Sequence, residues 1–168
     1  DCKSGVCKLN KCAPPTCMDG KKNGDENGID CGGATCGSCP LNHLVINEVD
    51  YDQVGTDGGE FVEIFNSTVS GVSLAGHKLI LIDGVSNAPY DFVDLSPAGT
   101  LGPGQYLVVC DAPVTPAAGA IKLTFASDMN RLQNGLSGGT GSPDGVALID
   151  DTNDKLIDAV SYEGGITT

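Results

Sequence analysis

Side chains that carry oxygen recur at every second position in one short segment near the N-terminus. Asn23, Asp25 and Asn27 alternate with other residues, and Gly28 follows them directly. Calcium binds six to eight oxygen ligands on a tightly turning backbone, and alternating oxygen ligands followed by Gly form the first half of an EF-hand-like loop. The spacing therefore predicts a calcium site in this segment.

Two further aspartates flank the segment, and we expect Asp19 and Asp30 to complete the coordination shell. The second half departs from the EF-hand pattern, because Ala34 stands at the twelfth position, where a bidentate Glu would bind. With disulfides beside it instead of helices, the site would be closer to the calcium repeats of thrombospondin-like proteins. The alternative is a turn rich in Asn, Asp and Gly that binds no ion.

A second group of acids lies between the first two expected strands. Asp50, Asp52 and Asp57 share a loop there, and carboxylates are ligands that calcium prefers. This group predicts either a second calcium site or charges that simply solvate the loop.

One segment further along the chain has the sequence of an N-glycosylation acceptor. Asn66 is followed by Ser67 and Thr68, which is the pattern that a glycosylating host recognises. In such a host, the sequence predicts a glycan on Asn66.

The cysteines are concentrated at the N-terminus, where seven of the eight lie between residues 2 and 39. Such density in a segment with few hydrophobic residues indicates a disulfide framework formed in an oxidising compartment. The cysteines are Cys2, Cys7, Cys12, Cys17, Cys31, Cys36, Cys39 and the isolated Cys110. Because seven is an odd number, either Cys110 pairs back to the N-terminal segment or one of the seven pairs with chain outside this sequence.

A zinc site is the alternative use of these cysteines. Cys36 and Cys39 have the spacing of half a zinc site, with Cys31 close by and His43 as the nearest histidine. In a secreted, cysteine-dense segment, disulfides are the stronger expectation.

The sequence contains no recognisable catalytic constellation. The two histidines, His43 and His77, stand at the edge and the start of expected strands. Pairs of acids are abundant, but the seventeen acids in residues 41–168 make chance pairs expected, so they do not indicate a glycosidase. We therefore expect a protein that is not an enzyme.

Charge is distributed unevenly along the chain. Residues 1–40 contain five Lys and five acids, whereas residues 41–168 contain four basic and seventeen acidic residues, which gives the whole net charge of −13. A domain of this charge repels phosphate, so we expect no nucleic-acid partner. No apolar run is long enough to span a membrane, so we expect no direct membrane insertion.

From residue 41 onwards, apolar and β-branched runs alternate with turn signals. Residues 60–65 alternate in the way that a half-buried strand does. The expected strands are residues 44–49, 60–65, 77–82, 90–95, 105–110, 121–125, 146–149 and 156–162. Strands at this spacing favour an antiparallel sandwich or barrel, and the only helical candidate is a turn at residues 127–132.

The order and spacing of these strands also resemble a lamin-tail domain, over roughly residues 44–163. The matching segments are residues 46–49, 60–66, 74–76, 101–109, 144–150 and 156–162. The resemblance implies an immunoglobulin-like sandwich without catalytic residues. In bacteria, such domains are accessory modules of secreted or surface proteins, sometimes attached to nucleases or other hydrolases.

The N-terminal segment has a resemblance of its own. Residues 17–33, with Cys36 and Cys39, are similar to cysteine-rich repeats in large surface proteins of myxobacteria and their relatives. Residues 1–7 look like the tail of a preceding repeat, which would account for the odd cysteine. The chain also starts at Asp1 without an initiator Met or a signal peptide, as we expect of a processed segment.

These observations predict an all-β protein with two parts. A disulfide-rich module of residues 1–40 is joined to an immunoglobulin-like antiparallel β-sandwich of residues 41–168. The expected role is that of a non-catalytic structural or adhesive module, secreted or on the cell surface, with calcium bound. Expected partners are other copies of the chain, which would form a fibre, or other surface proteins and glycans. The alternative is an accessory domain of a secreted hydrolase or nuclease.

Overall fold

The computed structural model describes residues 2–3, 5–8, 11–39, 41–54, 58–125, 132 and 143–165, without the side chains of Cys7 and Lys8. The chain forms two compact units, Asp1–Leu41 and Asn42–Thr168. Every buried hydrophobic side chain of the described residues belongs to the second unit. The two units are therefore stabilised by different means.

The first unit has little regular structure. Strands β1 (Cys7–Lys8) and β2 (Lys11–Cys12) pair antiparallel, and the other described residues form turns and extended chain. Three disulfides cross-link the unit, namely Cys2–Cys12, Cys17–Cys36 and Cys31–Cys39. A segment this small buries too little apolar surface to fold by that means alone, so the disulfides supply the constraint.

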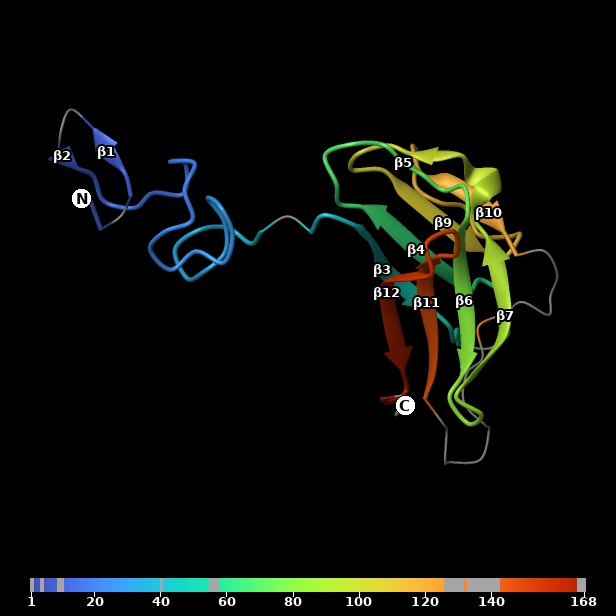
Figure 1. The fold of residues 1–168 in the computed structure, drawn as a ribbon. Helices are drawn as coiled ribbons and strands as arrows, with labels where there is room; N and C mark the ends of the chain where they lie inside the picture. The colour runs from blue at the N-terminus through green and yellow to red at the C-terminus, as the bar shows by residue number, and fades with distance from the viewer. Residues whose placement is uncertain are drawn as a thin grey trace. The chain divides into compact units, whose positions relative to one another are not determined.

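The second unit is a sandwich of two four-stranded sheets (Figure 1). One sheet contains β3 (Leu44–Asp50), β4 (Phe61–Asn66), β9 (Tyr106–Cys110) and β10 (Ile121–Thr124), in the order β10-β9-β4-β3. The other contains β6 (His77–Asp83), β7 (Ala88–Asp94), β11 (Asp144–Asp150) and β12 (Lys155–Tyr162), in the order β12-β11-β6-β7. Two short strands, β5 (Val72–Ser73) and β8 (Thr100–Leu101), pair with each other, and Ser96–Ala98 form the 3-10 turn η1.

Alternation along β4 shows how the sequence encodes a strand. Val62 and Ile64 are fully buried, whereas Glu63 and Phe65 are partly exposed. Successive side chains of a strand point to opposite faces, so one face of β4 joins the core and the other faces outwards. The core draws on both sheets and includes Leu44, Val62, Ile64, Leu79, Leu81, Leu107, Val109, Val146 and Leu148.

The strands agree closely with the sequence predictions. All eight expected strands are present, close to their expected bounds. Strands β1, β2, β5 and β8 were not expected, because two-residue strands leave no periodic pattern. Strand β10 pairs with β9 in parallel, whereas the other described strand pairs are antiparallel. Except for Leu132, the helical turn expected at residues 127–132 lies outside the described residues.

A hydrogen bond joins the two sheets at one side of the sandwich. Asp158 on β12 accepts a hydrogen bond of 2.8 Å from the backbone N–H of Ile46 on β3. Strand β3 is at the edge of its sheet, and an unpaired N–H there is a template for pairing with another chain. Asp158 thus both ties the sheets together and blocks one donor of this edge.

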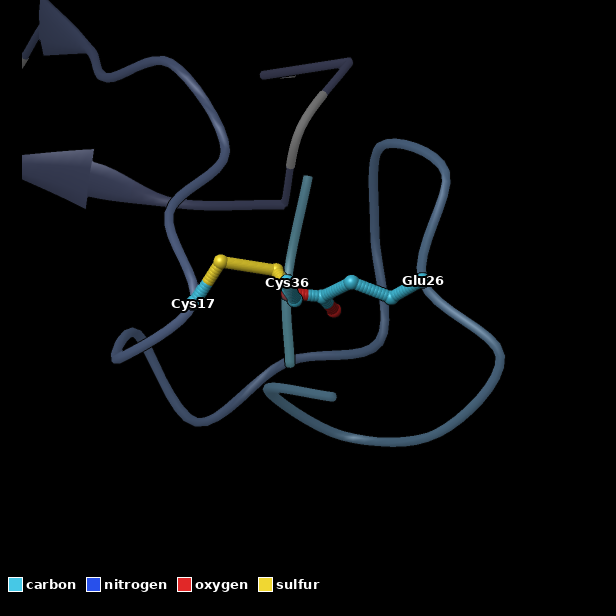
Figure 2. Close-up of side chains that lie close together, drawn as sticks. All are labelled: Cys17, Glu26 and Cys36. Atoms are coloured by element: carbon cyan, nitrogen blue, oxygen red, sulfur yellow. A yellow bond between two sulfur atoms is a disulfide. The ribbon is translucent and has the colours of Figure 1, made fainter. Parts of the chain in front are cut away.

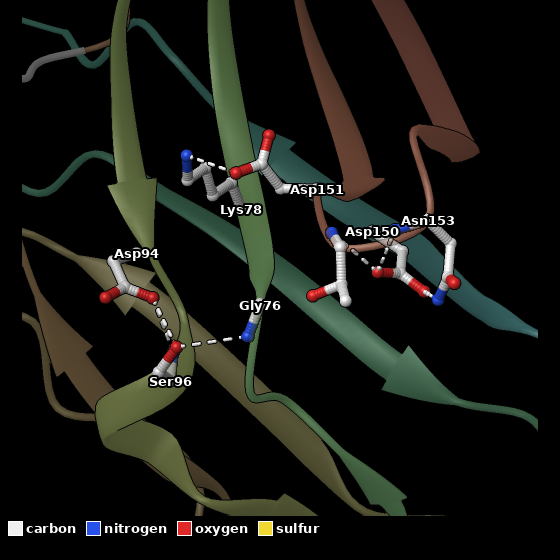
Figure 3. A network of polar contacts seen from close by, with 8 residues as sticks. Gly76, Lys78, Asp94, Ser96, Asp150, Asp151 and Asn153 are labelled. Carbon is white, nitrogen blue, oxygen red and sulfur yellow. Dashed lines mark hydrogen bonds and ion pairs between the residues drawn. The ribbon is translucent and has the colours of Figure 1, made fainter.

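A network of polar contacts fixes the beginning of β6 (Figure 3). The Ser96 hydroxyl accepts a hydrogen bond from the Gly76 N–H at 3.3 Å and donates one to Asp94 at 2.6 Å. The second bond holds the pKa of Asp94 below its ordinary value. Lys78 pairs with Asp151 at 2.7 Å, an exposed ion pair of the kind that contributes little stability. In this network, the hydrogen bond of Asp94 stabilises the turn at Ser96.

Candidate functional site

Two disulfides enclose the segment that the sequence predicts as a calcium loop. Cys17–Cys36 and Cys31–Cys39 bridge it, with Cα–Cα distances of 5.5 Å and 4.7 Å. Within the loop, two successive backbone N–H groups donate to the carbonyl oxygen of Cys31, at 3.0 and 3.1 Å. The candidate ligands therefore lie on a closed, cross-linked loop.

Asp19 and Asp30 each bind backbone N–H groups at the start of this loop. Asp30 accepts hydrogen bonds from the N–H of Asp19 at 2.8 Å and from that of Gly20 at 2.9 Å. Asp19 in turn accepts from the N–H of Thr16 at 2.9 Å and of Lys21 at 3.1 Å. Each carboxylate organises a turn of the backbone.

Asp25 closes the far end of the loop. Its Oδ2 accepts hydrogen bonds from the N–H of Ala34 at 2.7 Å and from the hydroxyl of Thr35 at 3.3 Å. The first of these bonds is the main reason why the pKa of Asp25 lies below its ordinary value. Ala34, which replaces the bidentate Glu of an EF-hand, thus supplies a backbone donor. Asn27 has an exposed side chain.

Among the described residues of the first unit, Glu26 is the one buried acid, and sequence reasoning missed it. It is 8 % exposed, and its Oε2 accepts a hydrogen bond from the N–H of Asn23 at 3.0 Å. Its Oε1 lies 3.4 Å from Cys36 Sγ, beside the Cys17–Cys36 disulfide (Figure 2). This is a contact, because a disulfide sulfur carries no proton to donate. Counted from Asn23, Glu26 is the fourth residue of the loop and lies between the alternating ligand positions, so the pattern gave no signal for it.

Gly28 serves a different purpose from the Gly of an EF-hand loop. Its φ is not positive, so no left-handed turn requires it. A Cβ at this position would lie 2.7 Å from Cys31 Sγ and 2.9 Å from Cys39 Sγ. Gly28 therefore leaves room for a disulfide.

A calcium site requires the oxygens of this loop to converge on one point. Within the described part of the chain, the one group of three Asp, Glu, His or Cys ligand atoms within 4.8 Å of one another belongs to Cys17, Glu26 and Cys36. The two sulfurs are bonded to each other, so they offer a metal no thiolate. Calcium needs six to eight converging oxygens, and the carboxylates of the loop are instead directed to backbone N–H groups. The calcium site remains a prediction from the sequence.

The second predicted group of acids is also not assembled in the described residues. Asp50 ends β3 and accepts a hydrogen bond from the side-chain amide of Gln53 at 2.9 Å. Asp52 has an exposed side chain. Asp57 lies outside the described residues, so a site that depends on it stays a prediction.

The disulfides settle several alternatives among the cysteines. Cys31, Cys36 and Cys39 are all bridged, so a zinc site that uses them is wrong. The prediction that Cys110 forms a disulfide is also wrong, because this thiol is free and fully buried at the end of β9. Its burial raises the pKa of the Cys110 thiol. The side chain of Cys7 lies outside the described structure.

Asn66 does not fit its predicted role as a glycan acceptor. It is completely buried, and its amide nitrogen donates to the carbonyl oxygens of Ser70 at 2.9 Å and Leu101 at 2.8 Å. Its Oδ1 accepts from the N–H of Thr68 at 2.9 Å. Both amide hydrogens are used inside the fold, so Asn66 fastens a loop in place and has no room for a glycan.

Buried acids at the strand ends of the second unit were also missed by sequence reasoning. Glu60 and Asp144 are 2 % and 3 % exposed. Glu60 accepts a hydrogen bond from the N–H of Leu132 at 3.0 Å, and Asp144 accepts one from the N–H of Gly84 at 3.1 Å. Burial is the main reason why the pKa of Asp144 is raised. The sequence signal for the burial of Asp144 was its position two residues before Val146, which places it on the inner face of β11.

Tyr162 lies opposite Asp144 in the register of β11 and β12. Its ring stacks on Tyr51 with a centroid distance of 4.3 Å, and the side chain is 8 % exposed. Burial raises the pKa of its hydroxyl strongly, so Tyr162 stays neutral at physiological pH. Perturbed groups often mark active sites, and here Asp144 binds a backbone N–H group while the Tyr162 ring stacks on Tyr51.

The fold and these contacts define an immunoglobulin-like β-sandwich module with a disulfide-linked N-terminal unit. A family model described as Lamin Tail Domain matches residues 39–164, so the chain belongs to the lamin tail domain family. This confirms the resemblance seen in the strands. No curated protein matches the chain. Three disulfides indicate an oxidising setting, and no helix of the described residues is long and apolar enough to cross a membrane.

Proposed function

We propose that the chain is a non-catalytic structural and adhesive module of an extracellular protein. The observation that carries this proposal is the use of its acids. Asp19, Asp25, Asp30 and Glu26 in the first unit, and Asp158 in the second, accept hydrogen bonds from the backbone. Side chains that could do chemistry therefore stabilise turns and sheet edges, and membership in the lamin tail domain family supports the same conclusion.

Two measurements test this proposal. Incubation of the full chain with nuclease, protease and glycosidase substrates should give no turnover above a buffer blank. Turnover that follows the purified chain would contradict it. Protein isolated from outside its cells should resist alkylation at the six bridged cysteines until it is reduced. Reaction of those cysteines without reductant would contradict an extracellular location.

The adhesive part of the proposal names copies of the chain, or other surface proteins and glycans, as partners. Strands β7 and β10 are sheet edges through which a further strand can add, whereas the edges β3 and β12 are joined by the hydrogen bond between Ile46 and Asp158. Sedimentation velocity at rising concentration tests self-association into a fibre. A single species at every concentration would limit the partners to other molecules.

Calcium is tested separately, because the described carboxylates do not converge on one point. The carboxylates of Asp19, Asp25 and Asp30 accept backbone hydrogen bonds, and each keeps further lone pairs with which to bind an ion. We propose that the loop binds calcium, and we expect a higher melting temperature in excess calcium than in excess chelator. Equal melting temperatures would contradict this part of the proposal. A rise in melting temperature with calcium, lost in Asp25→Asn, would show that the loop rearranges around the ion as the sequence predicts.

A further inference from the structure

The outer face of the sheet β10-β9-β4-β3 contains a groove of about 450 Å³. Glu63 and Tyr106 line its floor, and Gln105 and residues 117–120 line its walls. The volume falls in the range of small-ligand sites. Gln105 stiffens the wall, since it accepts a hydrogen bond from the N–H of Gly102 at 2.9 Å and donates one to the carbonyl oxygen of Gly119 at 3.2 Å.

The parallel pairing of β9 and β10 produces this groove. Two parallel neighbours need a crossover connection, and residues 111–120 provide it. Lys122 on β10 donates to the carbonyl oxygens of Ala112, at 2.7 Å, and of Val114. Val108, which lies beside Lys122 in the register, is only 4 % exposed. The connection therefore crosses the outer face and covers Val108, leaving the groove between itself and Tyr106.

Two aromatic rings form one side of the groove floor. Tyr106 lies opposite Phe65 in the register of β4 and β9, and their ring centroids are 4.7 Å apart. Phe65 does not line the groove, whereas Tyr106 does and is 37 % exposed. Phe65 thus supports the Tyr106 ring from behind and leaves ring surface available to a ligand.

The carboxylate of Glu63 is held beside this ring. Glu63 and Tyr106 are diagonal neighbours on the same face, a spacing that long and aromatic side chains bridge. Strand β3 has a register shift between Ile46 and Glu48, and a bulge of this kind re-aims a side chain. The intervening Asn47 donates a hydrogen bond of 2.7 Å to Glu63 Oε1. Within the described residues, no hydrogen bond is made to Oε2.

Charge selects the kind of ligand. Glu63 is the single charged side chain that lines the groove, and Lys122 is occupied beneath the crossover. Residues 41–168 carry the whole net charge of −13, so the field around the groove attracts cations and repels anions. An aromatic face next to a carboxylate binds a cationic side chain through cation–π attraction and a charge-assisted hydrogen bond.

We propose that this groove binds a cationic side chain, arginine or lysine, presented by a partner polypeptide. The cation stacks on Tyr106 and donates to Glu63 Oε2, while Asn47 holds Oε1. Arginine fits both contacts best, because its planar guanidinium stacks on rings and donates in a fixed fork. The inference rests on the adhesive part of the proposed function and names the chemistry of its partner.

Amide chemical-shift titrations of the full chain test the proposal. The probes are acetyl-Gly-Arg-Gly-amide, the same peptide with Lys, and the same peptide with citrulline, which has the shape of arginine without its charge. A neutral oligosaccharide, maltohexaose, is the fourth probe. The Arg peptide should shift the amides of Glu63 and Tyr106, and citrulline should bind roughly tenfold more weakly.

Four variants separate specific binding from general attraction. Glu63→Gln and Tyr106→Ala should each weaken the Arg peptide roughly tenfold, whereas Tyr106→Phe, which keeps the ring, should bind as the parent does. Asp154→Asn removes one charge from the β11–β12 turn and should have little effect. Equal weakening by Glu63→Gln and Asp154→Asn would overturn the proposal, as would binding of citrulline or maltohexaose equal to that of arginine. Such a failure leaves the non-catalytic, extracellular role standing, because turnover and alkylation test that role.

Discussion

At the scale of single residues, the acids of this chain fall into two groups, those whose pKa is lowered by hydrogen bonds and those whose pKa is raised by burial. Asp25, Asp83, Asp94 and Asp150 lie at turns, and hydrogen bonds lower the pKa of each. Asp144 is buried, and its pKa is raised. The first group stabilises the fold above the ordinary pKa of 3.8 and loses that contribution as the pH falls through the lowered values. Asp144 has the opposite effect, because its charged form destabilises the fold above pH 3.8 and this penalty disappears as the pH falls.

Asp144→Asn should therefore raise the free energy of unfolding at pH 7, by about 1 kcal/mol. The amide keeps an acceptor for the N–H of Gly84 and removes a buried charge close to Asp83 and Glu163. Below the unfolded pKa of 3.8, Asp144 is protonated in both states, so the gain should disappear there. Urea unfolding of parent and variant at pH 7 and pH 3 measures the difference.

The matched control is the same substitution at Asp94, whose pKa is lowered mainly by the Ser96 hydroxyl. Asp94→Asn should lower stability at pH 7. If both variants change stability in the same direction, the contrast between buried and turn-bound acids is incorrect.

Cys110 gives a second prediction at this scale. The thiol is fully buried and its pKa is raised, so little thiolate is exposed to a reagent at neutral pH. In the native chain, Cys110 should remain unlabelled by an aromatic disulfide reagent and should react rapidly in denaturant. Mass spectrometry of the labelled peptide measures this, and rapid labelling under native conditions would contradict the burial.

At the scale of elements, the loop of residues 19–35 depends on close approach between backbone and sulfur. Gly28 allows the Cys31–Cys39 disulfide to pass, and Gly33, at a φ of +74°, allows the carbonyl oxygen of Asp25 to approach. Gly28 is needed here for a steric reason, whereas Gly33 is needed for both a steric and a conformational reason.

Gly28→Ala should weaken the Cys31–Cys39 bridge, because the added Cβ would meet both sulfurs at under 3.0 Å. Overpacking of this kind costs about 1–3 kcal/mol, and we expect faster reduction of this disulfide by dithiothreitol. Peptide mapping of the alkylated products gives the rate for each bridge. Gly37→Ala is the control, since no atom lies within 4 Å of a Cβ there and its φ is not positive. Equal rates in the two variants would refute the steric role of Gly28.

At the scale of the whole molecule, the two units differ in what stabilises them. All three disulfides belong to the first unit, and every buried hydrophobic side chain in the described structure belongs to the second. Loss of disulfides from a small unit removes the constraint on its unfolded state. A sandwich with its own core has no such dependence.

Reduction of the intact chain should therefore unfold one unit and spare the other. Hydrogen exchange measured by mass spectrometry should show fast exchange in residues 11–39 after reduction. Protection in the strands β4, β6, β9 and β11 should be unchanged. Loss of protection in those strands would show that the sandwich needs the disulfides of its neighbour.

The sequence by itself determined the eight long strands, the sandwich class and the presence of a disulfide-linked unit. A two-residue period is a local property, so alternation along residues 60–65 already predicted the strand. Cysteine density was likewise visible without any coordinates.

Only the tertiary structure decided which groups meet. Cysteine pairing, the free state of Cys110 and the burial of Asn66 depend on residues far apart in the sequence. The parallel pairing of β9 and β10, and the groove beside it, depend on the path of a connection. Asp19, Asn23 and Asp25 have the spacing of ligands, but spacing does not fix where an oxygen points. In this fold, the carboxylates of Asp19 and Asp25 accept hydrogen bonds from backbone N–H groups, and within the described residues neither belongs to a group of three Asp, Glu, His or Cys ligand atoms within 4.8 Å of one another.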